Sequence, residues 1–366
     1  MTAAEVGIPS TRRSWRARWR DPHPRAIRVG PLSTRVDLRT LGVSGVLAAV
    51  VVIGLAWSVS VGDFPIPLRD VVGELTGLGG NRASSFIIQT LRLPRALTGL
   101  LIGAAFGISG QIFQRMVRNP LASPDILGVS SGAAVGAVLC IVAFAASSTM
   151  VTGGALVGAG LSVAAIYLLA IKKGLSSYRL VLIGIGITAM LNAVVAYLLT
   201  RAALYDAQRA TVWLTGSLNG RGWEYVRPLT IVLGVLIPLS LVLARSLRSI
   251  ELGDDTAQGL GVGIRRSKLA LSLCGAGLAA VATAAAGPVA FVALVAPQIA
   301  RRLVGDRAVG LVPAGLIGAA IVVFADVLAR RLFSPTELPV GVITAVVGAP
   351  YLLWLLARSN RIGTGG

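Results

Sequence analysis

The chain contains few charged residues for its length. Asp, Glu, Lys and Arg make up only 13% of its 366 residues, whereas soluble domains carry about 25%. There is one histidine, His23, and both cysteines, Cys140 and Cys274, lie inside apolar runs. This composition argues against a histidine-based metal site, and the cysteines are expected to be small buried side chains. We therefore expect no metal-binding, cofactor-binding or catalytic residue.

Two signatures of energy conversion are also missing. The sequence has no G-x-x-x-x-G-K-[ST] motif, so the chain is not expected to hydrolyse ATP itself. It also lacks paired carboxylates within its apolar runs, which a proton-coupled carrier would use. Asp326 is the one acidic residue well inside such a run, and Arg330, one turn later, offers a local ion-pair partner. A proton-relay or substrate role for Asp326 is the alternative.

What the chain has in abundance is apolar sequence. It is 55% hydrophobic, with a mean hydropathy of +0.79. A helix of about 20 apolar residues crosses the roughly 30 Å hydrocarbon layer of a bilayer. The sequence therefore predicts an all-α integral membrane protein with ten transmembrane helices. The predicted spans are residues 41–61, 94–116, 126–146, 150–171, 180–200, 228–244, 269–286, 289–304, 309–327 and 340–356.

The net charge of +19 is distributed over short loops and the N-terminal segment. That distribution favours the positive-inside rule over nucleic-acid binding, so we expect no nucleic-acid partner. An even number of spans and the balance of Lys and Arg place both termini in the cytoplasm. We assign residues 1–40 to a disordered basic cytoplasmic tail resting on anionic membrane lipid, 41–358 to the transmembrane domain and 359–366 to a short cytoplasmic tail. A twin-arginine export signal is the alternative for the tail, but no A-x-A cleavage site follows the first apolar run.

Two local patterns predict further features. Gly99, Gly103 and Gly107 recur at every fourth residue, which places a glycine stripe on one helix face where another helix can approach closely. Residues 68–75, between the first two spans, predict a short amphipathic helix.

The segment from Ile250 to Val262, IELGDDTAQGLGV, predicts a short helix between two spans. Leu252, Ala257 and Leu260 would lie roughly on one side of it, and Gly261 would end it. Such a helix can dock into a groove of a partner protein. An ordinary amphipathic helix on the membrane surface is the alternative, and the residues alone leave both open.

Seven sequence blocks follow one another through the chain: LRLPR (91–95), RNPLASPDILGVSSGA (118–133), LIGIGI (182–187), WLTGSL (213–218), LGDDTAQGLGV (252–262), GPVAFVALVAPQIARRLVG (287–305) and ADVLARRLFSPTELPVGVITAVVGAPYLLWLL (325–356). In this ordered set the chain resembles the FecCD-type permease family of ABC importers, the iron-siderophore and vitamin B12 permeases. The resemblance implies a type II importer of the B12-permease kind in the bacterial cytoplasmic membrane. It implies as partners a second permease subunit, identical or paralogous, two ABC ATPase subunits, and a substrate-binding protein or lipoprotein.

The resemblance also implies roles for particular residues. It makes the 250–262 segment the ATPase-coupling helix, with Leu252, Gly253, Asp254, Ala257, Leu260 and Gly261 as its residues. Many family members have histidine where this chain has Gln298, so we expect no acid–base role there. The candidates for the translocation pathway or for helix packing are Gly110, Arg118, Asn119, Pro120, Gly128, Ser130, Gly132 and Pro297.

The function expected from these observations is ATP-driven inward transport of a ferric siderophore, since APQIARRL looks more like the siderophore branch of the family. Cobalamin and haem are the alternative ligands, and an ion-gradient-driven secondary carrier is the alternative class. Arg201, Arg209 and Arg221, in predicted outside segments, are expected to pair with acidic residues of a binding protein.

Overall fold

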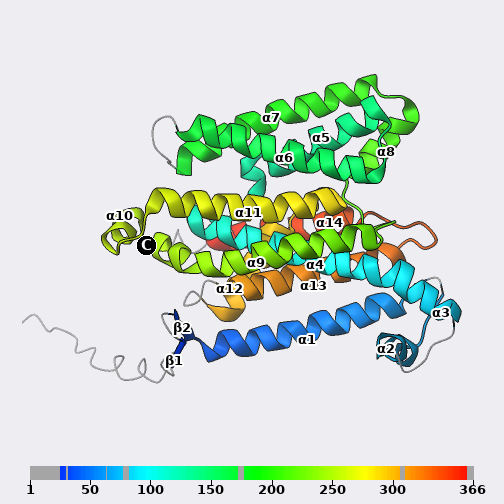
Figure 1. Cartoon of the computed structure of the whole chain (residues 1–366), viewed down its shortest axis with the longest axis horizontal. Coiled ribbons are helices and arrows are strands. Elements are labelled where there is room, and N and C mark those ends of the chain that lie inside the picture. The colour runs from blue at the N-terminus through cyan, green and yellow to red at the C-terminus, as the bar shows by residue number, and fades with distance from the viewer. Residues whose placement is uncertain are drawn as a thin grey trace, which may run out of the picture.

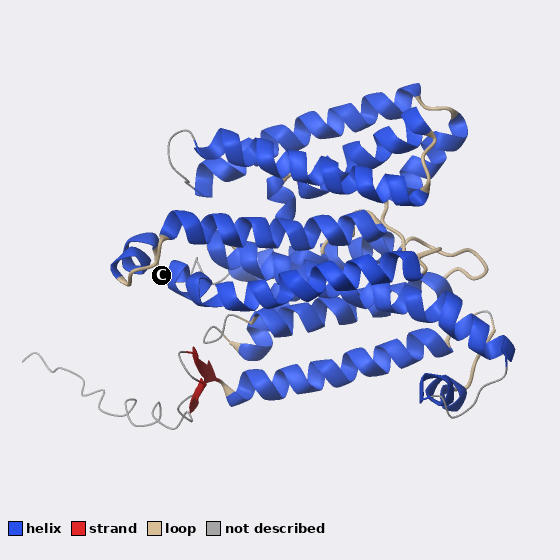
Figure 2. Cartoon of the chain, in the orientation of Figure 1, coloured by secondary structure: helices blue, strands red, loops and turns tan. Residues whose placement is uncertain are grey.

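The computed structural model describes residues 25–29, 32–62, 64–76, 82–171, 177–305 and 310–360. Within them the protein is a bundle of long helices with one small two-stranded ribbon (Figure 1, Figure 2). The elements are β1 (Arg25–Val29), β2 (Leu32–Val36), α1 (Leu38–Ser60), α2 (Leu68–Thr76), α3 (Arg82–Phe86), the π-helix η1 (Ile87–Arg92), α4 (Leu93–Val117), the 3₁₀ helix η2 (Pro124–Leu127), α5 (Val129–Phe144), α6 (Ser148–Ile171), α7 (Ser177–Arg201), α8 (Leu204–Leu214), α9 (Trp223–Glu251), α10 (Asp254–Gly259), α11 (Ile264–Ala286), α12 (Val292–Val304), α13 (Leu311–Arg331) and α14 (Val340–Asn360).

The strands β1 and β2 lie within the segment assigned to the basic tail, residues 1–40. β1 pairs antiparallel with β2, and Arg25 lies opposite Val36. The assignment of residues 1–40 to a disordered tail stays a prediction. Residues 1–24 and 30–31 of the predicted tail and residues 361–366 of the short C-terminal tail lie outside the described residues.

In chain order, the predicted spans overlap the helices α1, α4, α5, α6, α7, α9, α11, α12, α13 and α14. In the described part of the chain, seven helices are long and apolar enough to cross a membrane, and Val129–Phe144 and Val340–Trp354 are shorter apolar helices. α12 has 13 residues, which at 1.5 Å per residue is about 20 Å, less than a hydrocarbon layer. The all-helical membrane fold is confirmed, while ten complete crossings stay a prediction.

α4 is the centre of the bundle. It packs against α9, α11, α12 and α13, while α1 lies beyond α13 at one edge and α5, α6, α7 and α8 lie together at the other (Figure 1). In the most apolar window of the α4 span 78% of the residues are buried inside the molecule, against 22% in α1. α4 therefore belongs to the protein core, whereas most of α1 is exposed on the surface of the bundle.

The glycine stripe explains how α4 reaches this position. A Cβ atom on Gly103 would overlap the backbone oxygen of Gly318 in α13, and a Cβ on Gly318 would overlap the oxygen of Gly103. Gly107 meets the backbone of Ala314 in the same way. The two helices thus touch backbone to backbone, as the four-residue spacing predicts.

Gly103→Ala is therefore expected to lower the stability of the subunit by about 1–3 kcal/mol, because the added methyl must push two helices apart. Gly160→Ala is the matched control, since a Cβ there has no atom within 4 Å. Thermal unfolding of the purified variants measures both. Equal melting temperatures for the two variants would show that the close contact is not needed.

The two ends of the bundle differ. α10, the start of α1 and the end of α14 lie together at one end, called here the α10 end, and α2, α3 and α8 lie at the opposite end (Figure 1). α2 confirms the short amphipathic helix predicted between the first two spans.

Candidate functional site

α10 is the short helix predicted between two spans. Gly253 before it (φ +117°) and Gly261 after it (φ +81°) have backbone conformations that favour glycine. Ala257 is fully buried, whereas Leu252 and Leu260 are 65% and 64% exposed. The expectation that these three residues share one side is therefore wrong: Ala257 seats the helix on the bundle, and the two leucines remain exposed.

One ion pair fixes α10 to the bundle, and a second lies beside it at the end of α9. Lys268 Nζ of α11 lies 2.5 Å from Asp254 Oδ2, and Lys268 is almost completely buried. Beside it, Arg115 Nη1 of α4 lies 2.7 Å from Glu251 Oε2 at the end of α9. The first pair joins α10 to α11, and the second joins α9, the helix that precedes α10, to α4.

Gln298 joins α12 to α4 through neutral groups. Its Nε2 donates to Oε1 of Gln114 and, at 3.1 Å, to the backbone oxygen of Pro120. Gln114 Nε2 in turn donates to the oxygen of Leu294 at 3.0 Å. Sequence reasoning missed this link, although the polar Gln114 inside an apolar run was a signal for it.

A polar cavity of about 260 Å³ lies beside this link at the α10 end. Its lining brings together four of the candidate residues, Arg118, Asn119, Pro120 and Pro297, and adds Gln111, Gln114, Arg115, Glu251 and Arg301. Arg118 ends α4 in a left-handed conformation (φ 56°), which turns the chain into the loop that lines the cavity.

The other four candidates lie elsewhere. A Cβ on Gly110 would overlap the backbone of Ala293 in α12, and one on Gly132 would overlap Gly158 in α6, so both glycines occupy close helix contacts. Gly128 precedes α5 with φ +59°, and Ser130 donates to Asp125 Oδ1.

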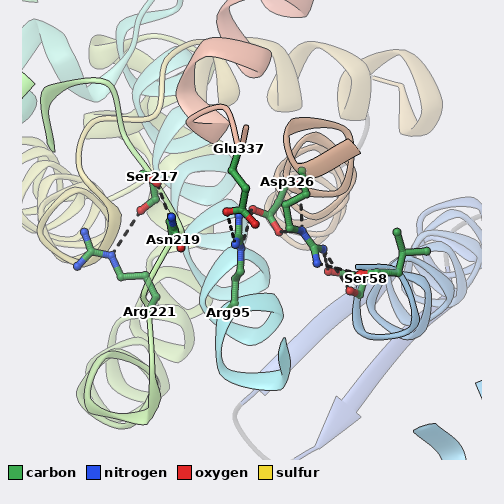
Figure 3. A network of polar contacts seen from close by, with 9 residues as sticks. Ser58, Arg95, Ser217, Asn219, Arg221, Asp326 and Glu337 are labelled. Carbon is green, nitrogen blue, oxygen red and sulfur yellow. Dashed lines mark hydrogen bonds and ion pairs between the residues drawn. The ribbon is translucent and has the colours of Figure 1, made fainter. Parts of the chain in front are cut away.

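The opposite end carries a charged network (Figure 3). Asp326 of α13 pairs with Arg330 at 3.1 Å, which confirms the predicted local ion pair. Asp326 Oδ1 lies 2.9 Å from Nη2 of Arg95 in α4. Arg95 Nη1 in turn lies 2.9 Å from Glu337 Oε2. Arg330 also donates to Ser58 Oγ of α1 at 2.7 Å.

Asp326 thus ties three helices together through two guanidinium groups. Sequence reasoning missed Arg95 as a partner because 231 residues separate the two. An arginine inside an apolar run, directly after Pro94, was the available signal, since intramembrane charges usually pair. This double pairing fits a structural network better than a proton relay.

Beside this network is a larger cavity of about 550 Å³. It is lined by Ile141, Ser148, Val151, Thr152, Arg209, Val212, Trp213, Ser217, Asn219, Gly220, Arg221, Tyr225, Glu337, Leu338 and Pro339. Arg209 and Arg221, two of the arginines expected to meet a partner protein, line this cavity, whereas Arg201 is exposed and stacks over Tyr197 outside it.

The described residues hold no group of three or more His, Cys, Asp or Glu side chains placed to bind a metal ion. The candidate site comprises the two cavities described above, one at each end of the bundle, and the short helix α10.

The model of the FecCD transport family matches residues 49–358. The chain belongs to this family. Among its relatives, the ferric enterobactin transport system permease protein FepG of Escherichia coli is 42% identical over 86% of this chain and 95% of its own length. The probable siderophore transport system permease protein YfhA of Bacillus subtilis is 40% identical over 87% and 93%. The protein is therefore a multi-span membrane permease.

Comparison with solved structures agrees with this family assignment. A metal-chelate type ABC transporter in an inward-facing conformation matches with a TM-score of 0.78 and 27% identity, over 87% of this chain and 99% of that one. PsaBC from Streptococcus pneumoniae, at 15% identity and a TM-score of 0.51, shares the fold.

Proposed function

We propose that this chain is the permease subunit of an ATP-driven importer that moves a ferric siderophore inward across the bacterial cytoplasmic membrane. The main support is the family match together with relatives that are named for ferric enterobactin, Fe(3+)-citrate and achromobactin transport. These names favour a ferric chelate over cobalamin or haem.

Two features of the chain indicate its partners: the missing nucleotide-binding motif and the exposed leucines beside α10. Without a nucleotide-binding motif it needs two separate ABC ATPase subunits. The exposed Leu252 and Leu260 of the α10 segment offer apolar anchors for a groove on such a subunit. A second permease, identical or paralogous, and a substrate-binding protein or lipoprotein complete the assembly.

The orientation follows from charge. Arg118, Arg248, Arg265, Arg266 and Arg302 belong to segments at the α10 end. By the positive-inside rule that end faces the cytoplasm, and both termini face it too. The opposite end, with the exposed Arg201, then faces the binding protein, whose acidic residues would pair with it.

The mechanism is alternating access without chemistry on the substrate. ATP binding and hydrolysis in the partner displace α10, and the Asp254–Lys268 and Arg115–Glu251 pairs carry the motion into α11 and α4. The Gln114–Gln298 link extends it to α12. Substrate affinity changes between the two states, and ATP supplies the free energy.

Uptake of radiolabelled ferric siderophore into vesicles tests this function. The complete complex, with binding protein and ATP, is expected to accumulate iron in a vanadate-sensitive manner, and vesicles that hold this subunit alone are expected to accumulate none. Accumulation by the subunit alone that a protonophore abolishes would instead support an ion-gradient-driven carrier.

A further inference from the structure

The 550 Å³ cavity at the opposite end, called here the arginine cavity, holds two fixed guanidinium groups. Arg209 Nη2 donates to the backbone oxygen of Ala146 at 2.8 Å. Arg221 stacks 4.3 Å from the centre of the Tyr225 ring, and its Nε reaches the oxygen of Ser217 at 3.4 Å (Figure 3). A guanidinium has five N–H donors, so each arginine keeps donors for a ligand.

No carboxylate of the described residues lies within ion-pair distance of these two arginines. Glu337, the carboxylate in the lining, is already bound to Arg95. The network of Arg95, Arg330, Asp326 and Glu337 is neutral as a whole, so the cavity retains the charge of Arg209 and Arg221.

The rest of the lining fits a ligand with aromatic rings and anionic oxygens. Trp213 and Tyr225 are largely buried and contribute aromatic atoms to the cavity wall, and Thr152, Ser217 and Asn219 offer polar groups. Catecholates are aromatic and doubly anionic, so a ferric complex of three catecholates carries excess negative charge. Three hydroxamates only neutralise Fe³⁺, and their chelate gains little from unpaired guanidinium groups.

We propose that the arginine cavity binds one face of an anionic ferric chelate of the tris-catecholate class and discriminates against neutral tris-hydroxamate chelates. Arg209 and Arg221 bind its catecholate oxygens, and Trp213 and Tyr225 contact its rings. This inference rests on the proposed function, because it names the substrate class of the same importer.

Binding to the purified complex with its partner subunits, without binding protein, tests the proposal. The probes are ferric enterobactin, a tris-catecholate, and ferrichrome, a neutral tris-hydroxamate, and tryptophan quenching reports binding near Trp213. The wild type is expected to bind ferric enterobactin more tightly. Arg209→Gln combined with Arg221→Gln should raise that Kd by about a hundredfold, roughly tenfold for each charge-assisted contact, and leave ferrichrome unchanged.

Arg69→Gln is the matched control, because the exposed Arg69 of α2 pairs with Asp70 and lies outside the cavity, and it should change neither Kd. If the double variant does not fold, the salt dependence of binding to the wild type provides a second test. The wild-type Kd for ferric enterobactin should rise with ionic strength, whereas the Kd for ferrichrome should stay constant. Equal binding of both chelates, no binding of either, or a salt-independent Kd for ferric enterobactin would overturn the proposal. Energised iron uptake by the complex would still stand as the separate test of the proposed function.

Discussion

Asp326→Ala is expected to destabilise the subunit by about 3–5 kcal/mol, the usual cost of removing one partner from a buried ion pair. The Asp326 side chain is 3% exposed, and its partners Arg95 and Arg330 are 12% and 8% exposed. Without the carboxylate, two guanidinium groups are left close together in the bundle. Thermal unfolding of the purified subunit and the amount inserted in membranes measure the effect.

Glu337→Gln is the control for the same network. Glu337 also pairs with Arg95, but its side chain is 34% exposed, so water screens the interaction. The expected loss is about 0–1 kcal/mol. If Asp326→Ala proved as stable as Glu337→Gln, the network would not be the structural link between α1, α4 and α13 described above.

Leu252→Asp combined with Leu260→Asp is expected to abolish coupled transport. Both leucines are exposed, so the substitutions should leave the fold intact, yet each places a charge where an apolar anchor would enter the ATPase groove. Loss of two hot-spot contacts of at least about 2 kcal/mol each would weaken the association about a thousandfold. Pull-down of the ATPase subunits measures the association, and ATP-driven iron uptake measures the coupled transport.

The matched control replaces both leucines with methionine, which keeps the apolar contact and should retain most of the uptake. Wild-type uptake by the aspartate variant, with the subunit inserted normally, would rule out docking through this segment and restore the alternative of a helix lying on the membrane surface.

Much of the fold followed from patterns within short stretches of sequence. Apolar runs located the helices, and the four-residue spacing of Gly103 and Gly107 predicted their close contact with another helix. Gly253 and Gly261, at either side of α10, and the pairing of Asp326 with Arg330 were also visible locally. These features depend on bilayer thickness, helical periodicity and backbone sterics, which neighbouring residues determine.

The contacts between distant segments were not visible in this way. The sequence did not show that Arg95 would meet Asp326, that Gln298 would meet Gln114, or that Arg209 and Arg221 would line one cavity. It also placed Ala257 on one side with Leu252 and Leu260, whereas Ala257 alone is buried.

The sequence by itself therefore determined that this protein is a helical membrane permease of the FecCD family and where its helices lie, because bilayer solvation and helix periodicity act over one span at a time. The tertiary structure alone decided which charges of distant segments pair and which line a cavity. The reason is physical: a charge inside the bundle is stabilised by whatever lies next to it in space, and helix packing brings together residues far apart in the chain.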